Sequence, residues 1–185
     1  MRLLMLEREV KLAYTSIHEA RTAVAAAGAS LLRPRRLQRD TLFDTAEQSL
    51  RERGCALRVR DDAGRRVLTF KGPIQPAAMK LREEFETAVD DGDALVRLLA
   101  ALGYHRWFVY EKYREEYSLG SVIVAIDETP VGTFVELEGD EAGILSAAKG
   151  LGRRTDDFIL QSYRSLFLAR RGELGLRDDM VFADS

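Results

Sequence analysis

Two carboxylates and one ammonium stand at every second position of the first strand-like segment, which reads LEREVKL over residues 6–12. Because successive side chains of a β-strand point to opposite faces, Glu7, Glu9 and Lys11 share one face. Burying such a face costs free energy unless the charges neutralise one another or bind something ionic. The segment therefore forms either a solvated edge strand or one wall of an enclosed polar space.

The same alternation recurs in five later segments of the chain. The residues that share a face are Arg58 with Arg60, Thr69 with Lys71, Arg82 with Glu84 and Glu86, Lys112 with Arg114, and Glu136 with Glu138. Each group alone fits the wet face of an ordinary half-buried sheet. Their clustering by sign is less ordinary, because the cations gather on the middle strands and the acids on the first and last. In a closed or nearly closed barrel these charges would line a polar tunnel.

Strands and helices follow one another without a linker that marks a domain boundary. The strands expected after the first are 31–44, 56–60, 66–71, 79–88, 106–117, 122–128 and 133–138. The expected helices are 16–28, 46–53, 91–102, 141–149 and 156–170. With 46% hydrophobic residues in 185, we expect one domain over residues 1–171 and a flexible C-terminal tail over residues 172–185.

Composition excludes several classes of protein. The formal charge of −2 arises from 28 basic and 30 acidic residues, so no global basic field would collect nucleic acid. Cys55 is the single cysteine, which excludes an internal disulfide and fits a reducing compartment. No apolar run approaches the length needed to cross a bilayer. We therefore expect a soluble, cytoplasmic protein.

The side chains available for metal binding favour a hard cation. The two histidines, His18 and His105, have no other soft ligand near them in sequence, which argues against zinc. Carboxylates would instead hold magnesium, manganese or calcium. Arginine forks and lysine ammoniums bind phosphate oxygens, while a carboxylate-bound cation can bridge to the same phosphates. A lumen with one basic and one acidic wall thus predicts a triphosphate-like ligand.

The ordered set of motifs resembles the CYTH superfamily, also called triphosphate tunnel metalloenzymes, over residues 4–170. The matching positions are Glu7, Glu9 and Lys11; Asp40 with Phe43 and Asp44; Leu57 to Arg60; Thr69 to Lys71; Arg82, Glu84 and Glu86; Lys112 and Arg114; Asp127; Gly132 to Glu138; and Ser162 with Tyr163. The family includes class IV adenylyl cyclases and thiamine, inorganic and RNA triphosphatases.

The resemblance implies an α+β fold, an antiparallel eight-stranded closed or nearly closed β-barrel with flanking helices. It implies Mg²⁺ or Mn²⁺ as the cofactor, with Glu7, Glu9, Asp127, Glu136 and Glu138 as metal ligands. It implies that Lys11, Arg58, Arg60, Lys71, Arg82, Lys112 and Arg114 bind the phosphates. In a hydrolase, Lys11 would deprotonate the attacking water if burial among cations lowers its pKa; a second metal is the other candidate.

Three functions stay open at this point. A metal-dependent triphosphate hydrolase is our first choice, followed by an adenylyl cyclase and by a non-catalytic polyphosphate or nucleotide binder. One departure from the family pattern is Gln161, which stands where many hydrolytic members have a lysine. We expect a small-molecule partner, neither membrane nor nucleic acid, and leave a homodimer open. The basic run at residues 33–36 reads as solvated surface, and Asp40 and Asp44 as structural.

Overall fold

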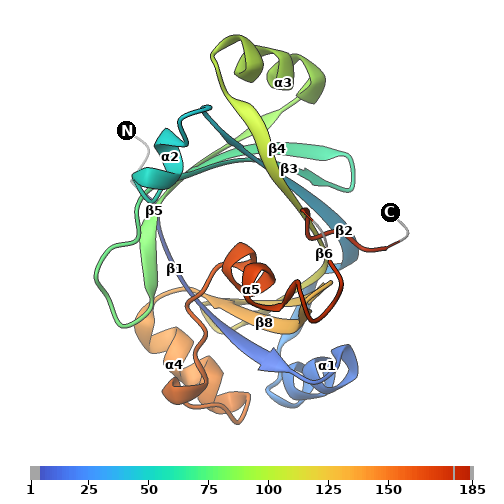
Figure 1. Cartoon of the computed structure of the whole chain (residues 1–185). Coiled ribbons are helices and arrows are strands. Elements are labelled where there is room, and N and C mark those ends of the chain that lie inside the picture. Colours follow the sequence, from blue (N-terminus) through green and yellow to red (C-terminus); the bar gives the residue numbers. More distant parts are fainter. Residues whose placement is uncertain (1–4, 177, 184–185) are drawn as a thin grey trace.

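The computed structural model describes residues 5–176 and 178–183, and over these residues eight antiparallel strands close into a barrel (Figure 1). The strands are β1 (Met5–Tyr14), β2 (Ser30–Asp44), β3 (Ala56–Asp62), β4 (Arg65–Lys71), β5 (Lys80–Val89), β6 (His105–Leu119), β7 (Val122–Thr129) and β8 (Gly132–Glu138). Around the barrel their order is β1-β5-β4-β3-β2-β6-β7-β8, and β8 pairs with β1 to complete the circle. The predicted fold class is confirmed.

Five α-helices accompany the barrel over the described residues: α1 (Ile17–Ala26), α2 (Ser49–Glu52), α3 (Gly92–Ala101), α4 (Glu141–Gly150) and α5 (Tyr163–Arg170). Side-chain oxygens cap several of their N-termini. The Ser16 hydroxyl accepts a hydrogen bond from the Glu19 amide at 3.2 Å, and Asp91 and Asp140 accept equivalent bonds at 2.8 Å. Within the part of the chain that the structure describes, none of the helices is both long and apolar enough to cross a membrane.

The helix predicted over 156–170 is wrong in its first half. A 3₁₀ turn spans Thr155–Asp157, and α5 begins only at Tyr163. The segment between them pairs with β1 instead of forming a helix. The amides of Lys11 and Ile159 each donate to the other's carbonyl, at 3.1 and 2.9 Å. This pairing brings the C-terminal segment against the first strand.

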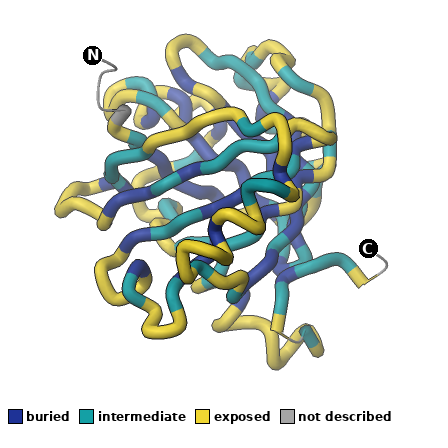
Figure 2. The backbone as a smooth tube through the Cα atoms, turned by 90° about the horizontal axis from the view of Figure 1, so that it is seen from above, coloured by how far each residue is buried: buried dark blue, intermediate teal, exposed yellow. Residues whose placement is uncertain are grey.

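The main apolar core lies outside the barrel wall, under α1 and α4. Val10 and Leu12 of β1 alternate with the charged residues of that strand and are at most 1% exposed. They pack in one cluster with outward-facing residues of β7 and β8 and with Val24 of α1 and Ile144 of α4. Figure 2 shows how buried and exposed positions alternate along the strands. The apolar faces thus point outward, and the barrel interior is left to the charges.

Helix α5 lies within the outline of the barrel and closes one of its ends (Figure 1). Its Tyr163 and Phe167 pack against Phe108 of β6 and Phe134 of β8. Phe167 is fully buried. This aromatic group, which we call the plug, separates the charged interior from solvent at that end.

The segment predicted to be a flexible tail contacts the barrel. The Met180 amide donates to the Val109 carbonyl at 2.9 Å, and the Glu111 amide donates to the Met180 carbonyl at 2.8 Å. Met180 is fully buried. The domain limits stay a prediction, and residues 1–4, 177, 184 and 185 of the predicted domain and tail lie outside the described residues.

Replacing Phe167 with alanine should lower the free energy of unfolding by about 3 to 5 kcal/mol, because the change leaves a cavity in the plug. Urea denaturation followed by circular dichroism measures this loss. Leu168→Ala, on the exposed side of the same helix at 42% exposure, should cost less than about 0.5 kcal/mol. Equal losses for the two variants would show that α5 does not plug the barrel as described.

Candidate functional site

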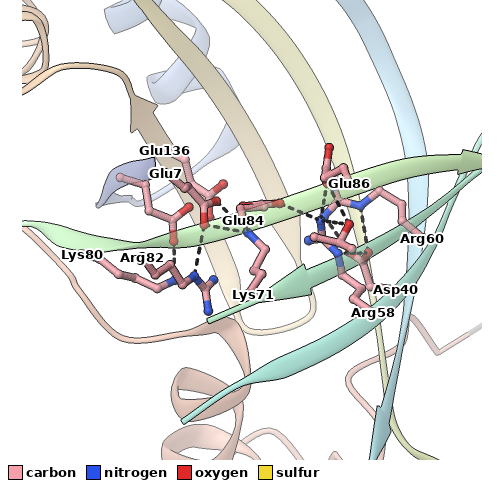
Figure 3. A network of polar contacts seen from close by, with 12 residues as sticks. Glu7, Asp40, Arg58, Arg60, Lys71, Lys80, Arg82, Glu84, Glu86 and Glu136 are labelled. Atoms are coloured by element: carbon pink, nitrogen blue, oxygen red, sulfur yellow. Dashed lines mark hydrogen bonds and ion pairs between the residues drawn. The ribbon is translucent and has the colours of Figure 1, made fainter. Parts of the chain in front are cut away.

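The charged residues predicted from sequence line the interior of the barrel. Their strands lie side by side, with Glu9 opposite Lys80 on one neighbouring strand and Glu138 on the other. Ion pairs also cross intervening strands: Lys71 of β4 reaches Glu7 of β1 over β5, with Nζ 2.7 Å from Oε1. Glu7 and Lys71 lie on the faces of their strands opposite Val10 and Leu68, which pack in the outer apolar clusters, so these groups share the lumen (Figure 3).

The acidic end of the lumen consists of Glu7, Glu9 and Glu138. Glu7 accepts hydrogen bonds from Lys71 at 2.7 Å and from Arg82 at 3.1 Å. Burial, followed by repulsion from Glu9, raises the pKa of Glu7 above its usual value. Partial burial, followed by repulsion from Glu7 and Glu9, raises the pKa of Glu138 to about 7. The three carboxylates therefore lie close enough to disfavour one another's ionisation.

Lys11 lies between carboxylates rather than among cations. It is 2% exposed, and its Nζ is 3.1 Å from oxygens of both Glu9 and Glu136. Burial alone would lower the pKa of Lys11, but the two carboxylates raise it well above its usual value. The premise on which sequence analysis gave Lys11 the role of general base does not hold in this structure.

Asp127 is the centre of a buried ion-pair group at the plug end. It is fully buried and accepts hydrogen bonds from Lys112 at 2.9 Å, Arg114 at 2.7 and 2.6 Å, and the Tyr163 hydroxyl at 2.6 Å. Arg114 also contacts Glu136. Sequence analysis predicted Asp127 as a metal ligand; in this arrangement both of its oxygens bind donors of the chain itself.

A second group of ion pairs lies on β2, β3 and β5 (Figure 3). Arg60 donates to both oxygens of Asp40 at 2.8 and 3.0 Å, and Arg58 approaches Asp40 at 3.5 Å and Glu86 at 3.3 Å. Burial opposes the ionisation of Asp40, but Arg60 and Arg58 lower its pKa far below the usual value. The structural role expected for Asp40 is thus to hold the two phosphate-binding candidates Arg58 and Arg60 in place.

Sequence analysis missed Lys80, which points into the same lumen and contacts Glu9. Burial lowers the pKa of Lys80 to about 8, although Glu9 opposes this shift. Burial, followed by repulsion from Arg114, also lowers the pKa of Lys112 to about 8. The signal for Lys80 was present, because it precedes Arg82 by two residues and therefore shares its face of the strand.

The donor set fits a hard cation in part. In residues 5–176 and 178–183, no three histidine, cysteine or acidic side chains converge as a ready metal site. The side chain of Glu138 has no hydrogen bond or ion pair within these residues, while Glu7, Glu9 and Glu136 each hold a lysine or arginine. The unpaired Glu138 side chain beside Glu7 and Glu9 suits a divalent cation, since oxygen donors of this kind bind magnesium and manganese.

Two other sequence features have a plain explanation. The arginines of residues 33–36 are neutralised: Arg33 and Arg36 pair with Asp62 at 2.9 and 2.7 Å, and Arg35 pairs with Glu128 at 2.8 Å. Such paired side chains do not form a basic patch for nucleic acid. Gln161, which stands where many hydrolytic members have a lysine, has an exposed side chain.

Comparison with known proteins places this tunnel among relatives. A Methanocaldococcus jannaschii protein named "Putative adenylate cyclase" is 29% identical over 143 residues, which cover 71% of this chain and 82% of that protein. A solved structure of the same name from Vibrio parahaemolyticus superposes with a TM-score of 0.75 at 20% identity, covering 89% of this chain and 98% of the other. The structure of a Hippeastrum protein superposes with a TM-score of 0.64 at 20% identity, covering 89% of this chain and 95% of the other.

Because both solved structures are only 20% identical to this chain, their likeness supports the fold and nothing more. The decisive match is that of residues 5–153, from the first lumen strand through α4, with the model of the CYTH domain. Because this match spans most of its length, the chain belongs to the CYTH domain family.

Proposed function

We propose that this chain is a divalent-metal-dependent phosphohydrolase that acts on a triphosphate-containing substrate bound inside the barrel. The observation that carries the proposal is the convergence, within one lumen, of a set of cations and a set of carboxylates from different strands. The cations are Lys11, Arg58, Arg60, Lys71, Lys80, Arg82, Lys112 and Arg114.

Charge balance explains why such a lumen would take an anion together with a metal. Without ligand, the lysines and arginines pair with carboxylates of the lumen, as Lys71 does with Glu7 and Glu84. A triphosphate that binds these cations leaves the carboxylates buried and unpaired, which costs free energy. A divalent cation on the released carboxylates removes that cost and adds attraction to the phosphates.

Each part of the lumen would then have a distinct role. The arginines and lysines would hold the phosphates in line for attack by water, so that most of the catalysis is positioning and electrostatic stabilisation. Magnesium or manganese held by Glu7, Glu9, Glu136 and Glu138 would supply Lewis-acid stabilisation of charge on the phosphate oxygens. Asp127 would keep Lys112 and Arg114 oriented toward the substrate, since it binds both side chains at once.

Two candidate activities share this site. The cyclase is the second candidate, because the Methanocaldococcus jannaschii relative carries that name. Hydrolysis comes first because the Hippeastrum protein, a cyclase by name, has a dominant triphosphatase activity.

The pure protein should be incubated with Mg²⁺ or Mn²⁺ and, in separate reactions, with inorganic triphosphate, thiamine triphosphate or ATP. Orthophosphate released without cyclic AMP would support the hydrolase and rank its substrates. Cyclic AMP formed together with an equal amount of pyrophosphate would show that the chain is a cyclase and not a hydrolase. Tight triphosphate binding with no product from any substrate would make the chain a binder.

Glu138→Gln should lower metal-dependent kcat/KM by about a hundredfold or more, because it removes a charge that would hold the cation without changing side-chain size. Steady-state kinetics over a range of Mn²⁺ concentrations measures the loss and any rise in the metal requirement. Glu83→Gln is the matched control, since Glu83 lies on the outer face of β5 beside Arg82. Full activity of the Glu138 variant would rule out the acidic end as the metal site.

Binding of inorganic triphosphate to metal-free protein should weaken as pH rises through about 8, because Lys80 and Lys112 lose their protons there. The sign follows from their lowered pKa, which makes both ammoniums neutral where ordinary lysines remain charged. Isothermal titration calorimetry between pH 6.5 and 9.5 would follow the change. Lys112→Arg should flatten the profile, because a guanidinium stays protonated; an unchanged profile would argue against titration of Lys112.

A further inference from the structure

Two arginines from different elements stack on the single tryptophan of the chain, which packs against the plug. The Cζ atom of Arg51, on α2, lies 4.5 Å from the centroid of the Trp107 ring. The Cζ atom of Arg164, on α5, lies 4.7 Å from the same centroid. Arg171, at the C-terminal end of α5, lies close enough to act electrostatically on Arg164.

The backbone around these arginines is well anchored. The Asp44 carboxylate accepts hydrogen bonds from the amides of Thr45, Leu50 and Arg51, at 2.8, 2.9 and 3.1 Å, and so holds α2 against the end of β2. On α5, the buried Tyr163 directly precedes Arg164 in the plug. Two fixed elements therefore present their guanidiniums to the same indole ring.

Within the described part of the chain, these guanidiniums have no carboxylate partner. Over residues 5–176 and 178–183, no carboxylate lies within 4.0 Å of the guanidinium nitrogens of Arg51, Arg164 or Arg171. Burial, followed by repulsion from Arg51 and Arg171, lowers the pKa of Arg164. Other stacked arginines differ, since Arg35 on Tyr113 has Glu128 at 2.8 Å. Like charges that converge without a counter-charge form a place for an anion.

We propose that Arg51 and Arg164, stacked on Trp107, form a second anion site on the outer side of the plug, with Arg171 adding positive charge near Arg164, and that this site binds a small phosphate anion such as pyrophosphate. The guanidinium fork matches phosphate oxygens in bidentate geometry, and arginines from two elements can bind different oxygens of one group. Stacking on the indole holds each fork in position and reduces the entropy lost on binding.

The neighbouring charges favour a compact anion over a long one. Glu47 and Glu52 flank Arg51 in sequence, and both are exposed. They would repel an extended acidic peptide or a nucleic-acid backbone that ran past the three arginines. A pyrophosphate bound here would bridge α2 to α5 and so hold the plug in place.

Trp107 makes the site directly observable, because its fluorescence is the only tryptophan signal of the chain. Metal-free protein in EDTA and chloride buffer should be titrated with pyrophosphate while this emission is recorded. We expect a saturable change, and a titration with sodium chloride alone at matched ionic strength should not reproduce it. A linear, non-saturating response, or an equal response to chloride, would overturn the proposal.

Variants separate this site from the lumen. R51M/R164M should weaken the pyrophosphate titration by about tenfold or more, as expected for lost charge-assisted hydrogen bonds. R53M/R97M removes the same net charge from exposed positions on the surface and should leave the titration unchanged. Since emission itself changes when Arg51 and Arg164 are removed, calorimetry should confirm the affinity.

A lumen variant, R58M, makes failure of this inference distinguishable from failure of the proposed function. The fluorescence titration should survive in R58M, whether or not the protein proves to be a hydrolase. If R58M abolishes the pyrophosphate response while R51M/R164M retains it in full, the anion binds in the lumen alone and the second site does not exist.

Discussion

Compensation of buried charge is the constraint on which this structure depends. Lys11, Lys112 and Asp127 are between 0 and 2% exposed, and an unpaired charge at such positions costs several kcal/mol, roughly enough to unfold a marginal domain. Each of them has a partner on another strand, as Lys11 of β1 has Glu136 of β8 and Lys112 of β6 has Asp127 of β7. The charges are therefore tolerable only when the barrel is closed in the observed register, so closure and pairing stabilise each other.

The inverted arrangement of the barrel follows from this constraint. With the inner faces of the strands charged, hydrophobic stabilisation has to come from the outer faces, which α1 and α4 cover. The plug adds hydrophobic stabilisation at one end of the barrel, where Phe167 packs against the ring of Phe108. Tyr163 joins the two systems, because its ring packs in the plug and its hydroxyl donates to Asp127. Polar lumen and apolar exterior are thus parts of one packing solution.

Most of the correct predictions about the lumen came from the alternation of side chains along the strands. Period-two spacing put Glu7 and Glu9 on one face, and the lumen contains both. The same rule covers Lys80, which was overlooked beside the more conspicuous Arg82. Pairing partners were out of reach, because alternation says which face a side chain occupies and nothing about which strand lies opposite. Two walls of opposite sign were expected; in the structure Lys11 and Lys80 lie among the acids, and Asp40 and Asp127 lie among the bases.

The sequence by itself determined the class of the fold and the charged character of its interior, because side-chain direction in a strand is a local property of the backbone. The protonation preferences were decided by the tertiary structure. Lys11 and Lys112 are both buried, yet the pKa of Lys11 is raised and that of Lys112 is lowered to about 8. Glu9 and Arg114 stand two residues from these lysines on the same strands, but only the fold buries both ammoniums and places Glu136 of β8 3.1 Å from Lys11. Electrostatic energies depend on burial and on distance in space, which the order of residues does not contain.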